Sequence, residues 1–345
     1  MIVVDHDVDP YRGSAAVPFH VEDPQRGHRA LNDRQDGCRL RDPSADPRYR
    51  GSVATVAQWI QGARPRTLPT AVSPVLVGTG AAVGAGAVEP VRALLALVVA
   101  LALVVGVNYA NDYSDGIRGT DDVRVGPLRL VGSRLAPPTA VRTAAFVSFS
   151  VAALAGLTLV SLSLQWWLVA VGALCIAGAW FYTGGRRPYG YAGLGEVAVF
   201  VFFGPVAVLG TTLTQSGALA APAIVGAVGV GALACAVLVV NNLRDIPTDS
   251  QVGKRTLAVV LGETDTRRLY AALVVLPLLL SVIAGVRSWP MLLGVLALPL
   301  AVTQARRVLG GAEGRRLITV LADTGVLLLV WSVATAVGLG LAAIA

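Results

Sequence analysis

Two clusters of carboxylate and amide side chains stand at the ends of strongly apolar segments. A carboxylate costs about 2.5–3.5 kcal/mol at the centre of a bilayer and less toward its surface, so such groups usually face a cavity and mark function. Carboxylates that converge from two helices repel each other unless a cation neutralises them, and hard divalent ions suit an all-oxygen donor set. We therefore predict a Mg2+ site shared with a phosphorylated substrate. The predicted metal ligands are Asp112, Asp115 and Asp121 in the first cluster, and Asp245 and Asp249 in the second.

The spacing within each cluster predicts that its residues share one helix face. Three residues of the first cluster stand at i, i+4 and i+7, and three of the second stand at i, i+3 and i+7. Gly116 and Gly119 predict the end of the first helix. Pro247 predicts a break or bend in the second helix, so we expect Asp249 to reach the site from a loop. The two faces consist of Asn108, Asp112 and Asp115, and of Asn242, Asp245 and Asp249.

Basic side chains crowd the loops that follow both clusters. A diphosphate needs more charge neutralisation than Mg2+ alone supplies, and arginine and lysine provide it through charge-assisted hydrogen bonds. Most of these residues also fit the ordinary excess of basic residues in cytoplasmic loops. Lys254 stands out because it is the only lysine among 28 Lys and Arg residues, which favours a catalytic role for a compact ammonium group. The other candidates for substrate binding in and near the clusters are Asn108, Asn111, Arg118, Asp121, Arg124, Arg129, Asn241, Asn242 and Arg244.

A third polar segment, residues 182–191, contains three tyrosines. Its rings are suited to stacking on an aromatic acceptor or to shielding a carbocation by cation–π contact, but an interfacial aromatic belt explains them equally well. Tyr182 and Arg186 are the substrate-binding candidates in this segment. Glu196 opens the next apolar stretch and is the one carboxylate outside the clusters that we expect near membrane depth.

Composition indicates a polytopic membrane protein. Of the 345 residues, 54% are hydrophobic and only 14% are charged, against roughly 25% in a soluble domain. All three histidines lie within residues 1–52, which argues against zinc or haem ligation and against a histidine base in the membrane part. The three cysteines have no metal-ligand or redox spacing. The net charge of +7 is better explained by cytoplasmic loops and anionic lipid headgroups than by nucleic acid, so we expect no nucleic-acid partner.

The apolar stretches predict an all-α fold with nine transmembrane helices around a central cavity, which cytoplasmic loops cap. Arginines are concentrated in alternate loops, whereas the opposite loops carry only Arg92 and Arg287. This bias predicts a cytoplasmic amino terminus, an extracytoplasmic carboxyl terminus, and both clusters on the cytoplasmic side of the cell membrane. The predicted spans are 67–87, 91–111, 139–160, 165–183, 194–213, 221–242, 269–286, 289–304 and 320–343.

Residues 1–52 are rich in Asp, Arg, Pro and Gly and lack hydrophobic periodicity. We predict that they form a disordered tail and that residues 53–345 form the transmembrane domain. Val53 is an alternative natural start of the protein, since the sequence from Val53 to Trp59 has the character of an amino terminus.

Three sequence strings resemble the UbiA superfamily of intramembrane aromatic prenyltransferases. They run from Asn108 to Asp121, from Asn241 to Asp249 and from Gly253 to Leu257, and the likeness extends from about Ala54 to the carboxyl end. Two features depart from the superfamily pattern. The spacing from Asp115 to Asp121 is longer than usual, and the Tyr-x-x-x-Lys element of the superfamily reads Tyr182-x-x-x-Arg186 here.

The resemblance implies a Mg2+-dependent transfer of a polyprenyl group from polyprenyl diphosphate to 1,4-dihydroxy-2-naphthoate. The implied reaction releases diphosphate and CO2 and belongs to menaquinone biosynthesis. Other acceptors, such as 4-hydroxybenzoate, homogentisate or haem, remain open, because composition and spacing do not distinguish them. A cation-coupled transporter is the alternative of a different class. Transporters usually bind ions at the midplane between repeats, whereas here both clusters are predicted on one side, which favours an enzyme.

Overall fold

The computed structural model describes residues 53–119, 128–219 and 221–342, and within these ranges the chain is helical and contains no strand. The predicted all-α class is therefore confirmed for this part of the chain. Predictions about the tail, Asp121 and Arg124 fall outside the described residues.

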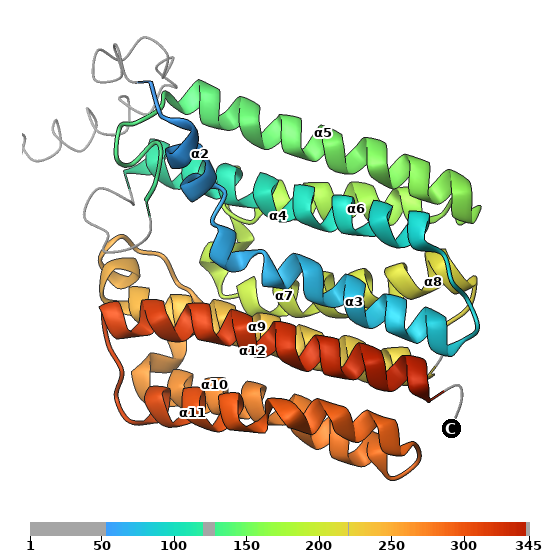
Figure 1. Ribbon diagram of the computed structural model, residues 1–345. Helices are drawn as coiled ribbons and strands as arrows, with labels where there is room; N and C mark the ends of the chain where they lie inside the picture. The colour runs from blue at the N-terminus through green and yellow to red at the C-terminus, as the bar shows by residue number, and fades with distance from the viewer. Residues whose placement is uncertain (1–52, 120–127, 220, 343–345) are drawn as a thin grey trace, which may run out of the picture. The chain divides into compact units, whose positions relative to one another are not determined.

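Figure 1 shows the helices along the chain. In chain order they are α2 (Val56–Gly62), η3 (Pro65–Thr67), α3 (Pro69–Gly84), α4 (Pro90–Arg118), α5 (Pro138–Ser163), α6 (Leu168–Phe181), η4 (Tyr189–Ala192), α7 (Gly195–Val201), the π-helix η5 (Phe202–Leu209), α8 (Gly210–Ser216), α9 (Ala221–Gln251), α10 (Leu257–Gly285), η6 (Trp289–Ala297), α11 (Leu298–Leu309) and α12 (Arg315–Leu341).

Among the described residues, seven helices are long and apolar enough to cross a membrane, or eight if the pair formed by Val56–Thr67 and Pro69–Gly84, bent by 50°, counts as one span. The chain is thus a multi-pass membrane protein. The prediction of nine spans is not reached, and the shortfall lies in α6. This helix has 14 residues and a length of about 21 Å, which is less than the roughly 30 Å of a hydrocarbon core.

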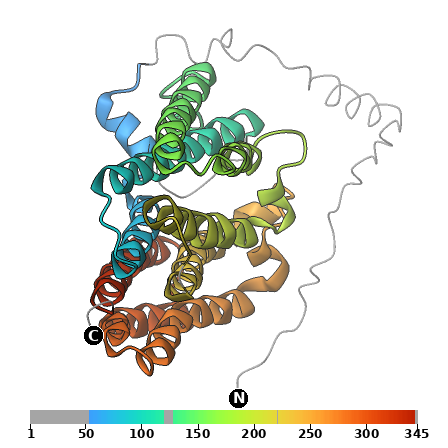
Figure 2. The same cartoon turned by 90° about the vertical axis from the view of Figure 1, so that its right-hand side faces the viewer.

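The long helices run side by side, and α9 lies among the others. Figure 2, which looks along the helices, separates α4 and α5 from α10 and α11, with α9 between them. Most of the apolar part of α9 is buried, and it packs against α10, α12, α7, η5 and α3. Close packing requires small residues: a Cβ at Gly229 would lie 2.1 Å from the ring of Trp331, which is itself buried.

The ends of the helices that carry the clusters are set by local sequence. As predicted, Gly119 ends α4, because it takes a left-handed conformation (φ 71°) that caps the helix, whereas Gly116 stays helical. The prediction of a break at Pro247 is wrong: α9 continues through it to Gln251, so Asp249 is helical. The proline removes one N–H donor and therefore one helical hydrogen bond, and the helix continues for about one more turn.

Candidate active site

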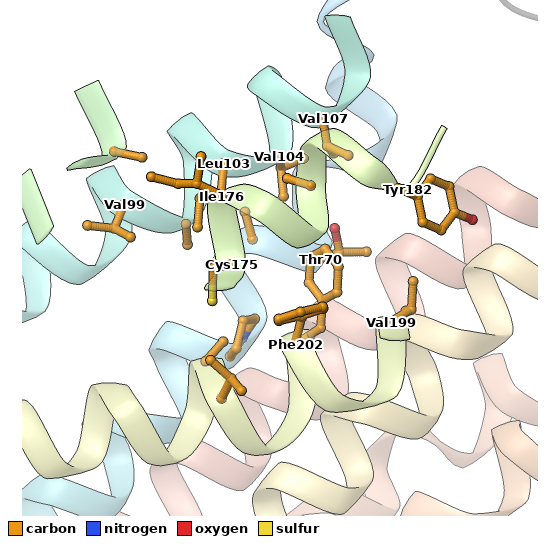
Figure 3. Close-up of a pocket in the computed structure, with 18 of the residues that line it drawn as sticks. Thr70, Val99, Leu103, Val104, Val107, Cys175, Ile176, Tyr182, Val199 and Phe202 are labelled. Carbon is orange, nitrogen blue, oxygen red and sulfur yellow. The ribbon is translucent and has the colours of Figure 1, made fainter. Parts of the chain in front are cut away.

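A cavity of about 550 Å³ lies between α3, α4, α6, α9 and the α7–η5–α8 segment. Its body is apolar: Val99, Leu103 and Val107 of α4 face Ile176 of α6 and Phe202 of η5 (Figure 3). One end is polar and lies where the two clusters meet. The polar residues at this end are Asn108, Asn111, Asp115, Arg129, Tyr182, Thr183, Asn241, Asn242 and Lys254.

Asp115 is the carboxylate of the first cluster that lines the cavity, and it is 5% exposed. It accepts a hydrogen bond from the Tyr191 hydroxyl at 2.6 Å and pairs with Arg129 at 3.3 Å. Asn111, one helical turn earlier, also lines the cavity and accepts a hydrogen bond from the Thr183 hydroxyl at 2.8 Å. The cavity face of α4 therefore includes the Asn111–Asp115 pair.

Asp112 does not line the cavity. Its side chain is fully buried, and its two carboxylate oxygens accept hydrogen bonds from the backbone amides of Leu130 (2.6 Å) and Val131 (3.1 Å). These amides belong to the segment that folds back over the end of α4 and carries Arg129. That Asp112 is a metal ligand stays a prediction, because each of its oxygens accepts one backbone amide here and a carboxylate oxygen can accept more than one partner. Asp112 anchors the loop that brings Arg129 to Asp115.

Asn108 lines the cavity at the level of the loop between α2 and α3. Its amide group donates to the Ala63 carbonyl at 2.9 Å and to the Thr67 hydroxyl at 3.0 Å. The contact fixes the bend between α2 and α3 against α4, so the described contacts of Asn108 are structural.

In the second cluster, Arg244 holds Asp245 through two parallel hydrogen bonds of 2.7 and 2.8 Å. The same guanidinium donates to Asn241 at 2.9 Å. Both charged side chains are almost completely buried, with 3% and 4% of the side chain exposed. A bidentate ion pair of this kind is rigid, and its hydrogen bonds compensate the desolvation of both charges. Asn241 and Asn242 line the cavity, whereas Arg244 and Asp245 are not among its lining residues.

Lys254 and Tyr191 connect the two clusters. The Lys254 ammonium lies 3.5 Å from Asp249 and 5.0 Å from the centre of the Tyr191 ring, while the Tyr191 hydroxyl donates to Asp115. Tyr191 was not among the site residues expected from the sequence, although the tyrosine-rich segment that contains it was noted. Its position gives that segment a clear role, since it joins Asp115 of α4 to the loop after α9.

The remaining candidates are divided between the cavity and the surface. Tyr182 lines the cavity, and burial, together with the nearby Glu196 carboxylate, raises the pKa of its phenol well above the usual range. Arg118 donates to the carbonyls of Thr183 and Gly185, so it holds the loop rather than facing the cavity. Arg186 is exposed and does not line the cavity, which disagrees with its predicted role in substrate binding.

Asn242 is oriented by a buried carboxylate. Its amide group donates to Glu196 Oε1 at 2.9 Å, and both residues are buried. Glu196 Oε2 has no hydrogen-bond partner among the described residues. Glu196 thus lies next to the polar end of the cavity, as its position at the start of an apolar segment suggested.

The donor set at the polar end fits a hard divalent cation in its chemistry. Within the described residues the available groups are carboxylate and amide oxygens, and histidine is absent. These residues form no group of three or more carboxylate, histidine or cysteine side chains close enough to hold a metal ion. Instead, three of the carboxylates are each paired with a basic side chain: Asp115 with Arg129, Asp245 with Arg244, and Asp249 with Lys254.

Comparisons with known proteins agree with this arrangement of helices and cavity. The sequence matches the UbiA prenyltransferase family over residues 71–317, and the chain belongs to this family. It is 59% identical to the 1,4-dihydroxy-2-naphthoate octaprenyltransferase of Mycobacterium tuberculosis over 82% of this chain and 97% of that protein. It is 39% identical to the Escherichia coli enzyme of the same name over 74% of this chain and 86% of that protein.

The fold is also similar to those of solved UbiA homologs. The apo structure of a homolog from Aeropyrum pernix K1 covers 77% of this chain and 96% of its own, with a TM-score of 0.61 at 14% identity. A homolog from Archaeoglobus fulgidus, solved bound to DMAPP and Mg2+, covers 81% of this chain and 98% of its own, with a TM-score of 0.57 at 13% identity.

Proposed function

We propose that this protein transfers a polyprenyl group, of the octaprenyl class, from its diphosphate to 1,4-dihydroxy-2-naphthoate in menaquinone biosynthesis. The observation that carries the proposal is the 59% identity to an enzyme of that name over nearly its whole length. The cavity supports it, because a polar end with carboxylates and basic groups continues into a long apolar body. A prenyl diphosphate has the same division into a charged head and an apolar tail.

The polar end is suited to the diphosphate head. Asn111, Asp115, Asn241, Asp245 and Asp249 would hold Mg2+, which when bound supplies neutralisation of the diphosphate charge and so stabilises it as a leaving group. Arg129, Arg244 and Lys254 already lie beside the three carboxylates. These basic groups are positioned to take up phosphate oxygens when the carboxylates turn to the metal. Their fixed positive charge then stabilises the departing diphosphate.

The apolar body is suited to the prenyl tail and to the exclusion of water. Ionisation of the allylic carbon creates a cation, which water would capture if it entered. Tyr182 lies at the polar end of the cavity, where its neutral aromatic ring can stabilise the cation by cation–π contact. The electron-rich naphthoate ring attacks the allylic carbon, and loss of its carboxylate as CO2 with loss of diphosphate gives demethylmenaquinol.

The acceptor assignment is tested by competition. Membranes that contain the protein are offered dihydroxynaphthoate, 4-hydroxybenzoate and homogentisate, each with octaprenyl diphosphate and Mg2+. We expect prenylated naphthol and release of labelled CO2 from the carboxyl-labelled naphthoate, with little product from the other acceptors. Prenylated hydroxybenzoate as the main product would overturn the acceptor while leaving prenyl transfer in place. No product with any acceptor would overturn the enzyme assignment.

We also propose nine membrane crossings, in which the bent α2–α3 pair and the short α6 each form one span. The clusters then lie on the cytoplasmic side, in accord with the arginine-rich loops at that end. Single cysteines at Ser133 and Ser216 test this topology in intact cells with an impermeant thiol reagent. We expect labelling at Ser216 and none at Ser133, and the reverse pattern would contradict the orientation.

The catalytic domain in this proposal spans residues 53–345. A chain that lacks residues 1–52 is expected to insert and turn over like the full chain, because the cavity is lined by residues from Arg64 onward. Loss of turnover in the correctly inserted truncated protein would contradict this boundary.

A further inference from the structure

A second cavity lies where α11 leads into α12, and the prenyl-transfer site does not use it. It has a volume of about 380 Å³, and its polar side chains are Arg306, Arg307, Arg316 and Thr319. No residue in its described lining carries a carboxylate. In Figure 1 the α11–α12 turn lies at the same end of the helices as the turn between α9 and α10. We call this cavity the arginine pocket.

The arginine pocket keeps a positive charge that its surroundings do not cancel. Arg307 is paired with Asp323 at 2.6 Å. Arg306 and Arg316 are exposed and form no ion pair within the described part of the chain. Two guanidinium groups therefore remain available to an anion at the mouth of the pocket.

The helix end beneath the pocket does not weaken this charge. The carboxyl end of α11 would present a partial negative charge there. However, the buried Arg267 donates to the carbonyls of Val308 (2.6 Å) and Ala312 (3.0 Å), which close that end of the helix. Arg267 is itself held by Glu263. Because the carbonyls are occupied from below, an anion in the pocket meets guanidinium groups rather than the negative end of a helix.

The position of the pocket indicates the source of the anion. It lies at the ends of two candidate membrane spans, Trp289–Leu309 and Arg315–Leu341, which is the level of lipid headgroups. On α11, Leu309 is 53% exposed and Val302 is 36% exposed, so apolar surface continues from the pocket along the helix. A phosphate group with acyl chains attached matches a basic pocket bordered by a lipid-facing apolar strip.

We propose that the arginine pocket binds the phosphate group of an anionic membrane lipid, whose acyl chains lie along α11. A free phosphate has the same charge chemistry but would gain nothing from the apolar strip. The lipid is therefore expected to bind where inorganic phosphate at similar concentration does not.

The test compares two double variants of the full chain in nanodiscs of phosphatidylcholine with increasing phosphatidylglycerol. Arg306→Gln/Arg316→Gln removes two charges from the pocket. Arg268→Gln/Arg315→Gln removes two exposed charges from the neighbouring segments without touching the pocket lining. Retained phosphatidylglycerol is measured by mass spectrometry, and the thermal midpoint is measured at each lipid composition. The pocket variant loses the two guanidinium groups that would donate charge-assisted hydrogen bonds to the lipid phosphate, so its binding of phosphatidylglycerol should weaken roughly 30-fold.

We expect the control variant to bind within about threefold of the original, because its two arginines lie outside the pocket lining and would not contact the phosphate. Equal weakening in the two variants would overturn the pocket as a specific site. Protection by inorganic phosphate or glycerol phosphate equal to that by the lipid would assign it to a soluble anion instead. Arg306→Lys/Arg316→Lys keeps the charge and should retain binding, which separates loss of the site from loss of the fold. Prenyl transfer in phosphatidylcholine alone should be the same in all variants.

Discussion

The two clusters contain the same short pattern, an asparagine followed four residues later by an aspartate, but they neutralise the aspartate in different ways. In α4, the partners of Asn111 and Asp115 come from distant segments, namely Thr183, Tyr191 and the loop residue Arg129. In α9, Asp245 is held by Arg244, its neighbour in the same helix. The pairing of Asp115 therefore depends on the folding of loops, whereas the Arg244–Asp245 pair forms within one helix.

This difference explains the role of Asp112 in the first cluster. The loop that supplies Arg129 has to be fixed over the end of α4, and Asp112 fixes it through two backbone amides. A Cβ at Gly116 would lie 2.4 Å from the Val131 side chain, so the same loop also requires a glycine beneath it. The Arg244–Asp245 pair of the second cluster needs no such loop, because Arg244 is part of the helix.

The largest expected effect is shared by both clusters. Asp115→Asn and Asp245→Asn should each lower kcat by at least about 100-fold, because each removes a negative oxygen that would bind the metal beside the diphosphate. Rates are measured in proteoliposomes over a Mg2+ titration, with EDTA-treated protein as the metal-free reference. If one variant kept a rate near that of the original protein, the two clusters would not act as a pair.

Asp112→Asn should instead act through stability. An asparagine offers one acceptor oxygen in place of two and brings a buried NH2 group toward a backbone amide, which costs about 1.5–3 kcal/mol. We expect a lower unfolding midpoint in denaturant titrations and a smaller loss of turnover than for Asp115→Asn, with the Mg2+ dependence of the remaining activity unchanged. A strong rise in the Mg2+ requirement at unchanged stability would indicate that Asp112 binds the metal.

Much of this arrangement could be predicted from the sequence because it follows from apolar length and from charge. The helical class, most of the spans and the convergence of Asp115, Asn241 and Lys254 on one end of a cavity belong to that part. The short length of α6 could not be predicted in this way, because the apolar residues of the sequence continue beyond the ends of this helix.

The assignment of individual carboxylates could not be predicted from spacing alone. In a helix of 3.6 residues per turn, Asn111 and Asp112 point about 100° apart, and spacing alone does not determine which of them faces the cavity. The partners that decide between them, the amides of Leu130 and Val131, lie 18 and 19 residues away in a loop without periodicity. Tyr191 was missed for a similar reason, because its hydrogen bond to Asp115 spans 76 residues.

Tyr191→Phe sharpens the comparison by removing one long-range partner of the first cluster. The variant loses the hydroxyl that donates to Asp115 but keeps the ring beneath Lys254. A hydrogen bond to a charged group contributes about 1.5–3 kcal/mol, so we expect turnover to fall by roughly tenfold to 100-fold with little change in stability. The matched control is Tyr189→Phe, whose hydroxyl donates to the Gly178 carbonyl away from the carboxylates. If Tyr191→Phe and Tyr189→Phe lowered turnover equally, the hydrogen bond from Tyr191 to Asp115 would have no specific role in linking the two clusters.

The smallest effect is expected where the second cluster does use a distant partner. Asn242 donates to Glu196, and a glutamine at position 196 keeps a carbonyl oxygen to accept that bond. Its NH2 group would take the place of Glu196 Oε2, which has no partner in the described structure, so the exchange replaces one unsatisfied buried group by another. We expect Glu196→Gln to change KM and kcat by less than about threefold, whereas Glu196→Ala leaves the Asn242 amide without its acceptor and costs about 1–3 kcal/mol. Because Asn242 lines the cavity, that cost should be seen in KM as well as in stability.

A loss of kcat in Glu196→Gln comparable to that of Asp245→Asn would show that the carboxylate charge itself is required. The second cluster would then depend on a distant segment as much as the first does.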